Sequence, residues 1–278
     1  MTRFLAMALA SVSLSIAAPA FAQDATSATP AVSAELTKAL AASNRDADRA
    51  RDQFRHPAET LAFFRVEPGM KVGEYAPGGG WYSRVLGNYM SPQGKLVGLF
   101  FTPEEGVFDE KAREGIRKGA EGFPAKVEEW TGRKAGGTQG LTLDTVTDAD
   151  KGTFDRILVV RMMHNMLRWN FADSELKAMR DLLKPGGMLG VVQHRAKPQA
   201  SGDYANGTKG YLRQRDVIGL VEAMGFELVG TSEINANPRD TADHDDGVWA
   251  MKPSWRNKRP ELENLGESDR MTLLFRKR

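Results

Sequence analysis

The chain has 278 residues, a formal net charge of +2 and no cysteine. So small a charge argues against nucleic acid as a partner, since nucleic-acid-binding domains usually carry a strongly basic face. The lack of cysteine excludes disulfides, thiolate metal ligands and a lipid anchor on cysteine.

The first 22 residues are predicted to be a signal peptide. Arg3 supplies a positive start, residues 4–18 form an apolar run, and Ala-Phe-Ala at 20–22 has the form of a signal-peptidase site. The run is shorter than the ~20 apolar residues that a membrane-spanning helix needs, so cleavage is favoured over a retained anchor. We therefore expect a periplasmic or secreted protein with no membrane partner after cleavage.

The rest of the chain is expected to form three parts. Residues 23–34 are rich in Ala, Thr, Ser and Pro and predict a flexible lead-in. Residues 35–66 predict N-terminal helices, namely one long amphipathic helix over 35–55 and a second helix that Pro57 begins. Residues 67–278 predict one α/β domain.

Within that domain, strands alternate with helices. Strands are predicted at 70–75, 95–101, 154–162, 188–193, 226–231 and 271–276, and a further one lies within either 125–130 or 140–146. Helices are predicted at 81–90, 103–119, from Asp173 or Ser174 to 183, and at 217–224. This alternation is typical of βαβ units and of a mostly parallel sheet.

The most informative segment is the strand at 71–75, which leads through three glycines at 78–80 into a helix. Such a turn lets backbone N–H groups approach a ligand that side chains would otherwise block. Glu74 closes the strand, where its carboxylate can accept hydrogen bonds from a hydroxyl or ammonium group. The turn predicts a site for a nucleotide or nucleoside cofactor. A dinucleotide-dependent oxidoreductase is disfavoured, because residues 76–82 do not supply Gly-x-Gly-x-x-Gly.

Four stretches together resemble the class I S-adenosylmethionine-dependent methyltransferases, and more narrowly the exported members predicted in proteobacteria. They are residues 74–82, residues 161–165, the Lys-Pro-Gly-Gly turn at 184–187 with 193–195, and residues 233–240. The resemblance implies a Rossmann-like, seven-stranded, mostly parallel sheet in the order 3-2-1-4-5-7-6, with strand seven antiparallel. It also implies that S-adenosyl-L-methionine binds across the carboxyl ends of strands one and two, in agreement with the general rule for open α/β sheets.

The resemblance further implies which residues hold the cofactor: Glu74, Ala76, Gly78, Gly79 and Gly80. Ala76 stands where many members of the family have a glycine. Many members also end strand two with an acid that binds the ribose hydroxyls, and here that position falls at Phe100 or Phe101. The nearest acids are Glu104 and Glu105, and Glu104 is the expected substitute.

Two histidines are the candidate catalytic residues. His164 follows strand four and His194 follows strand five, so both should face one cleft and supply a base that unmasks the methyl acceptor. Arg161 and Arg195 end the same strands and could bind an anionic substrate or the cofactor carboxylate. The alternative is structural: the histidines hold loop backbone and the arginines pair with carboxylates.

The long connection at 235–269 is a candidate lid with substrate contacts, since long loops without regular structure are often functional. Its acidic stretch at 240–246 could instead be a solvated loop, and no metal site is predicted.

The sequence therefore predicts an S-adenosylmethionine-dependent methyltransferase with a small-molecule or protein acceptor. The alternative is an exported, non-catalytic binding module that retains the fold and binds a nucleoside or an anionic metabolite. The missing ribose acid and the export of the chain from the compartment that makes the cofactor both favour this alternative.

Overall fold

The computed structural model describes residues 30–105 and 108–278, so the predicted signal peptide and most of the lead-in lie outside the described residues. The helices are α1 (Ala34–Leu40), α2 (Asp52–Arg55), α3 (Pro57–Phe63), α4 (Trp81–Tyr89), α5 (Glu110–Thr131), α6 (Met163–Arg168), α7 (Ala172–Leu182) and α8 (Gln214–Ala223). The strands are β1 (Lys71–Tyr75), β2 (Lys95–Phe100), β3 (Thr138–Thr142), β4 (Phe154–Val160), β5 (Leu183–His194), β6 (Phe226–Ser232) and β7 (Arg270–Lys277). Within the described residues, no helix is both long and apolar enough to span a membrane.

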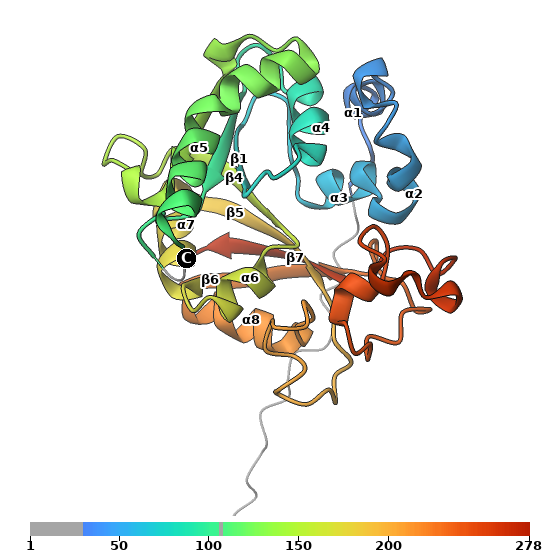
Figure 1. The fold of residues 1–278 in the computed structure, drawn as a ribbon. Coiled ribbons are helices and arrows are strands. Elements are labelled where there is room, and N and C mark those ends of the chain that lie inside the picture. The colour runs from blue at the N-terminus through green and yellow to red at the C-terminus, as the bar shows by residue number, and fades with distance from the viewer. Residues whose placement is uncertain (1–29, 106–107) are drawn as a thin grey trace, which may run out of the picture.

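The seven strands form one sheet in the order β3-β2-β1-β4-β5-β7-β6 (Figure 1). β7 runs antiparallel to β5 and β6, and the other neighbouring pairs are parallel. The predicted fold class is confirmed. For the strand with two alternative positions, the structure has β3 at Thr138–Thr142, which overlaps the alternative at 140–146. Residues 125–130, the other alternative, belong to α5.

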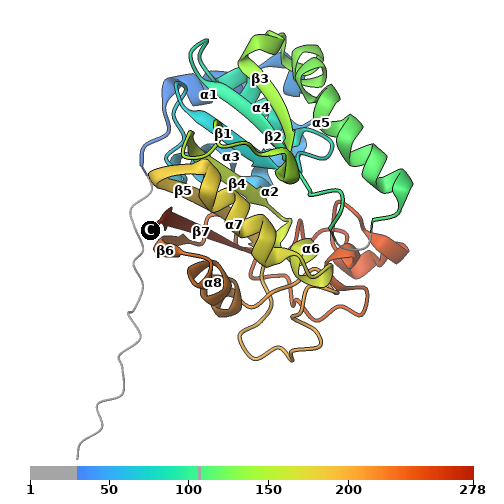
Figure 2. The same ribbon diagram turned by 90° about the vertical axis from the view of Figure 1, so that its left-hand side faces the viewer.

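Helices cover both faces of the sheet. α1, α3, α4 and α5 pack on one face and α7 and α8 on the other, so that α7 lies in front of the sheet in Figure 2. Side chains of a strand alternate between the two faces. Leu158 of β4 accordingly packs with the α4 group, whereas its neighbours Ile157 and Val159 pack with the α7 group. This two-sided core holds the carboxyl ends of the strands in fixed positions.

The expectation of one long helix over 35–55 is wrong. α1 ends at Leu40, short 3₁₀ turns follow at Ser43–Arg45 and Arg49–Arg51, and α2 is a single turn. The cause is Arg45, whose side chain is buried rather than solvated. Its guanidinium binds both oxygens of Asp52 and donates to the Leu40 carbonyl, which α1 leaves without a helical donor.

The helix expected at 103–119 also has different bounds. α5 begins after Asp109, whose side chain accepts from the Ala112 N–H, and it continues through Pro124 to Thr131. Pro124 has no N–H for the Ala120 carbonyl. Gly140 of β3 passes close to that carbonyl, where a side chain would not fit. The predicted cap of α7 is wrong as well, because no side chain caps this helix and Ser174 donates to Glu105 instead.

The connection at 235–269 contains short 3₁₀ turns and no α-helix or strand. It lies beside the N-terminal segment at one end of the sheet, as the blue and red parts of Figure 1 show. Arg51 and Arg55 join the two segments, because both bind Glu267. Two parts of the chain that are more than 200 residues apart thus close over the same edge of the sheet.

Gly80 offers a test of how the turn before α4 is packed. A Cβ atom on Gly80 would lie 2.2 Å from the Trp130 ring, and the φ of Gly80 is +74°. We expect Gly80→Ala to lower the free energy of unfolding by about 2 kcal/mol or more, from overpacking and left-handed backbone strain together. Gly79→Ala is the control, since a Cβ atom there meets no atom within 4 Å. Urea denaturation of both variants measures the effect, and equal losses would contradict it.

Candidate active site

A cavity of about 530 Å³ lies at the carboxyl ends of β1, β4 and β5. This volume is in the range of small-molecule sites. Its walls come from the glycine turn, the segment after β4, the end of β5, the N-terminal segment and the 235–269 connection. The residues that line the cavity include Asp48, Arg51, Arg55, Glu74, Ala76, Gly78, Gly79, Trp81, Tyr82, Arg84, Arg161, His164, His194, Trp249, Lys252, Glu267 and Ser268.

The three glycines of the turn have different roles. A Cβ atom on Gly78 would meet only the Ala76 oxygen at 3.9 Å, and one on Gly79 would meet nothing within 4 Å. The backbone at these two positions therefore faces open space in the cavity. Gly80 packs on Trp130 and precedes α4 in a left-handed conformation. Ala76 is also left-handed, with a φ of 49°, which explains why glycine suits that position.

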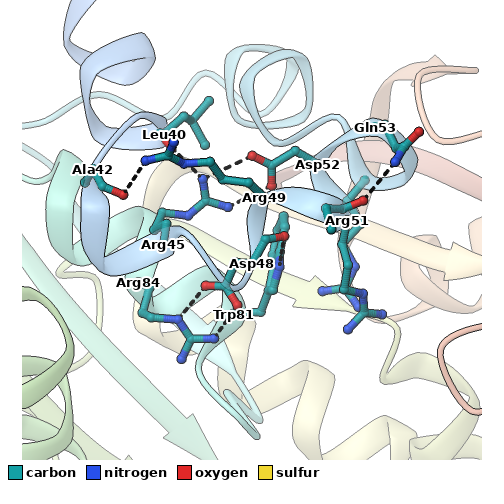
Figure 3. Close-up of polar contacts among 12 residues, drawn as sticks. Leu40, Ala42, Arg45, Asp48, Arg49, Arg51, Asp52, Gln53, Trp81 and Arg84 are labelled. Atoms are coloured by element: carbon teal, nitrogen blue, oxygen red, sulfur yellow. Dashed lines mark hydrogen bonds and ion pairs between the residues drawn. The ribbon is translucent and has the colours of Figure 1, made fainter.

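Arg84 of α4 fastens the turn to the N-terminal segment. Its guanidinium donates to the Gly79 carbonyl. It also binds both carboxylate oxygens of Asp48, as Figure 3 shows. Asp48 also accepts, through its backbone carbonyl, a long hydrogen bond from the Trp81 ring N–H. The glycine turn is therefore held through its Gly79 carbonyl, while the Cα atoms of Gly78 and Gly79 face open space.

Glu74 is buried beside the turn, with 5% of its surface exposed. Its carboxyl accepts a 2.6 Å hydrogen bond from the Ser83 hydroxyl. Burial raises the pKa of Glu74 to about 8, although Ser83 and Arg84 act in the opposite direction. A cation bound nearby would favour the ionised carboxylate and lower this pKa again. Glu74 thus suits a ligand with an ammonium or sulfonium group.

The rings of His164 and His194 lie next to each other in the cavity wall, with their centroids 5.5 Å apart. His164 Nδ1 is 3.3 Å from Gln193 Oε1. The Gln193 amide donates to the Gly210 carbonyl, which fixes its orientation. His164 Nδ1 therefore carries the hydrogen and Nε2 has the free lone pair. Burial, with Arg168 and Arg161, lowers the pKa of His164 to about 4.

His194 is bound through Nδ1 to the Ser268 hydroxyl at 2.6 Å. Burial, and then the neighbouring His164 and Arg161, hold its pKa well below the usual value. Both histidines are therefore uncharged at neutral pH. Their rings contact side chains, and not the loop backbone that the structural alternative invoked.

Glu104 does not lie in the cavity wall. It is exposed on the loop after β2 and pairs with Arg113 and Arg117 of α5. Arg195 is likewise outside, where it binds Glu233 and Asp269, so its structural interpretation is confirmed.

The end of β2 is filled by aromatic side chains. The ring of Phe101 lies 5.4 Å from that of Tyr75 and 5.8 Å from those of Trp169 and Phe171. The next N–H, that of Thr102, is taken by the buried Glu175. Among the described residues, none from β2 or the loop after it lines the cavity. The cavity therefore spans β1, β4 and β5, and not β1 and β2 as the resemblance implied.

The contribution of the N-terminal segment was not predicted, whereas the 235–269 connection was a candidate lid with substrate contacts. Arg51 and Arg55 come from the N-terminal segment, and Trp249, Lys252 and Glu267 come from the 235–269 connection. The spacing of Arg51 and Arg55 was visible in the sequence, but their pairing with Glu267 was not. The acids of the connection are partly structural, since Asp240 is fully buried and binds His244, Tyr211 and backbone N–H groups.

The comparisons with known proteins agree with this architecture. An S-adenosylmethionine-dependent methyltransferase from Aquifex aeolicus superposes with a TM-score of 0.51 at 13% identity, over 87% of this chain and 98% of that one. The chain has a class I methyltransferase fold. The cyclase SpnF is also similar, with a TM-score of 0.49, 14% identity and 80% of each chain covered.

A third similar structure is the 1,6-didemethyltoxoflavin-N1-methyltransferase from Burkholderia thailandensis, solved with S-adenosylhomocysteine. Its TM-score is 0.46 at 12% identity, over 84% of this chain and 82% of that one. No family model matches the sequence, and a search of curated proteins finds no match. At such low identities the likeness shows the fold alone, and function must be argued from the site.

Glu74 predicts a pH dependence of stability. Its pKa is raised in the folded chain to about 8 from 4.5, so the folded state binds this proton more tightly. The free energy of unfolding should therefore fall as the pH rises from 5 to 8. Glu74→Gln removes this contribution, and the variant should gain stability relative to wild type over that interval. Urea denaturation at several pH values measures this, with the exposed Glu59→Gln as control. A difference that is constant with pH would contradict the assignment.

Proposed function

We propose that the protein is an S-adenosylmethionine-dependent methyltransferase that acts on a small-molecule acceptor. One observation carries this proposal: a single cavity in a methyltransferase fold brings together the open backbone of Gly78 and Gly79, the buried Glu74 and the bases His164 and His194. Sites at the carboxyl ends of strands are the rule in open α/β sheets.

The methionine end of the cofactor fits this chain. Gly78 and Gly79 offer backbone without side chains in the way, and Glu74 offers a carboxyl that a nearby cation would ionise. When bound there, S-adenosylmethionine supplies a methyl group on a cationic sulfur. The adenosine end lacks the usual acid, since Phe101 packs among aromatic rings after β2.

The chain's own contribution to the reaction is to orient the acceptor and to take its proton. His164 lines the cavity and its Nε2 has the free lone pair, so Nε2 is our candidate for the proton-accepting atom. Gln193 keeps this tautomer in place through its hydrogen bond to Gly210. His194, held by Ser268, is the adjacent second base. A general base of this kind typically contributes about 10²–10⁴ to the rate.

We further propose that the protein belongs to the exported branch of this family and works in the periplasm or after secretion. The support is the signal-peptide pattern of residues 1–22, which lie outside the described residues.

The alternative is a non-catalytic binding module for a nucleoside or an anionic metabolite. The aromatic packing at the end of β2 favours it, because the ribose has no carboxylate there. Binding and turnover assays on the same sample distinguish the two functions.

Calorimetric titration of residues 23–278 with S-adenosylmethionine and S-adenosylhomocysteine is the first test. We expect both to bind, and we expect Gly78→Asp to abolish the heat, because its side chain would occupy the open space at the turn. Absence of heat from wild type at high micromolar ligand would overturn the methyltransferase proposal. Binding without methyl transfer to any member of an acceptor panel would favour the binding module.

His164→Ala tests the base. Cofactor affinity should be nearly unchanged, while kcat should fall by about 10² or more. The control is His244→Ala, which removes a buried histidine that binds Asp240 outside the cavity, and this variant should lose stability rather than kcat per folded molecule. Unchanged turnover in His164→Ala would assign that histidine a structural role.

A further inference from the structure

Three arginines bind one carboxylate at the edge of the cavity, and a fourth lines the same cavity. Arg51 Nε lies 2.7 Å from Glu267 Oε1, Arg55 Nε lies 3.3 Å from both Glu267 oxygens, and Arg270 Nη1 lies 3.1 Å from Oε2. Arg161 is close enough to Glu267 and Arg270 for their charges to act on it. We call Arg51, Arg55, Arg161 and Arg270 the arginine cluster. With Glu267 its formal charge is +3.

The donors of the arginine cluster are not saturated. Arg55 Nη2, Arg161 Nε and Arg270 Nε are buried without a hydrogen-bond partner. Within the part of the chain that the structure describes, the Arg161 side chain makes neither a hydrogen bond nor an ion pair. The side chains of Arg55 and Arg270 are each only 3% exposed, so water does not replace the missing partners fully.

Two other arginines of the same region each have a carboxylate of their own, and only Nε of Arg45 lacks a hydrogen-bond partner there. Arg45 binds Asp52 and Arg84 binds Asp48, as Figure 3 shows, whereas Arg51 points away from that network. Burial of charge without a partner costs several kcal/mol, and chains normally avoid it. Burial lowers the pKa of Arg55 and Arg161, yet only to about 10, so both remain charged at neutral pH. The excess charge is best explained by an anionic ligand.

We propose that the arginine cluster binds the carboxylate or phosphate group of the methyl acceptor, so that the acceptor is a small organic anion. This proposal rests on the methyltransferase function proposed above. Arg51, Arg55 and Arg161 line the cavity and would donate to the anionic group. Arg270 lies behind them and adds charge.

The position of the arginine cluster favours the acceptor over the cofactor's own carboxylate. The cluster lies beside the histidines, because His194 is paired with Arg270 in the β5–β7 register and its ring binds Ser268, the neighbour of Glu267. Arg161, Arg270 and Arg55 accordingly depress the pKa of His194. Glu74, beside the open glycine backbone, is influenced instead by Ser83 and Arg84. The anion site is therefore at the base end of the cavity, where the nucleophile must be.

Binding of inorganic phosphate tests this site without any cofactor. Calorimetry at constant ionic strength should show phosphate binding to residues 23–278. Benzoate should also bind, and its neutral analogue benzamide should not. Arg161→Gln removes an unpaired side chain, so it should fold and should lower phosphate affinity about tenfold or more. Arg256→Gln, which removes the same charge from an exposed position outside the cavity wall, should leave the affinity unchanged.

Two results would overturn the proposal. Equal losses in Arg161→Gln and Arg256→Gln would mean that phosphate responds only to overall charge. A tenfold loss of S-adenosylhomocysteine affinity in Arg161→Gln, with phosphate binding unchanged, would assign the cluster to the cofactor carboxylate. If Arg161→Gln fails to fold, Arg51→Gln, at a half-exposed position, provides the same comparison.

These measurements distinguish failure of the anion site from failure of the methyltransferase function. If phosphate binding depends on Arg161 but the protein does not bind S-adenosylmethionine, the anion site is supported and the methyltransferase function is contradicted. If the protein binds the cofactor and transfers methyl groups but binds neither phosphate nor benzoate, the methyltransferase function is supported and the anion site is contradicted.

Discussion

The carboxylate of Glu267 is the constraint on which the site depends. It is the shared partner of Arg51, Arg55 and Arg270, and so it joins the N-terminal segment to the 235–269 connection across the edge of the sheet. Both segments lack long helices, and neither packs a large apolar face over the cavity. Their closure therefore relies on a buried ionic cluster. Such clusters add little net stability compared with apolar packing, but breaking one by removing a single partner is costly. Loss of this one carboxylate would leave three buried or partly buried guanidinium groups without their shared partner.

The sheet could be predicted because its signals are local. Apolar strands, the turns that separate them and the alternation with helices gave the strand positions, and the resemblance gave the order that the structure has. The errors arose where tertiary contacts override local pattern. Charged residues at 45–52 were expected on a solvated helix face, but Arg45 turns inward and ends α1. The helix expected to end at residue 119 instead continues through Pro124 to Thr131, and Gly140 of β3 passes close to the Ala120 carbonyl that Pro124 leaves without its helical donor.

The site was predictable to the extent that it follows strand ends. Glu74, Gly78, Gly79, His164 and His194 all line one cavity because parallel strands place their carboxyl ends at one edge. Glu104 was expected to bind the ribose because it is the acid nearest in sequence to the end of β2. The sequence gives no sign of its ion pairs with Arg113 and Arg117 of α5. The arginine cluster could not be predicted either, since Arg55 and Glu267 are 212 residues apart. No periodicity links two loops that meet only in the folded chain.

The two ends of the cavity have opposite electrostatic character, and this bears on how a base with so low a pKa can work. At one end Glu74 is a buried carboxyl that gains from a nearby cation. At the other end the arginine cluster has an excess of positive charge over Glu267, and Arg161 lowers the pKa values of both His164 and His194. An anionic acceptor bound there, as proposed above, would neutralise the charge that opposes protonation of the histidines and would raise their pKa values. The free cavity then holds neutral, weakly basic histidines, and the acceptor itself would strengthen the base that takes its proton.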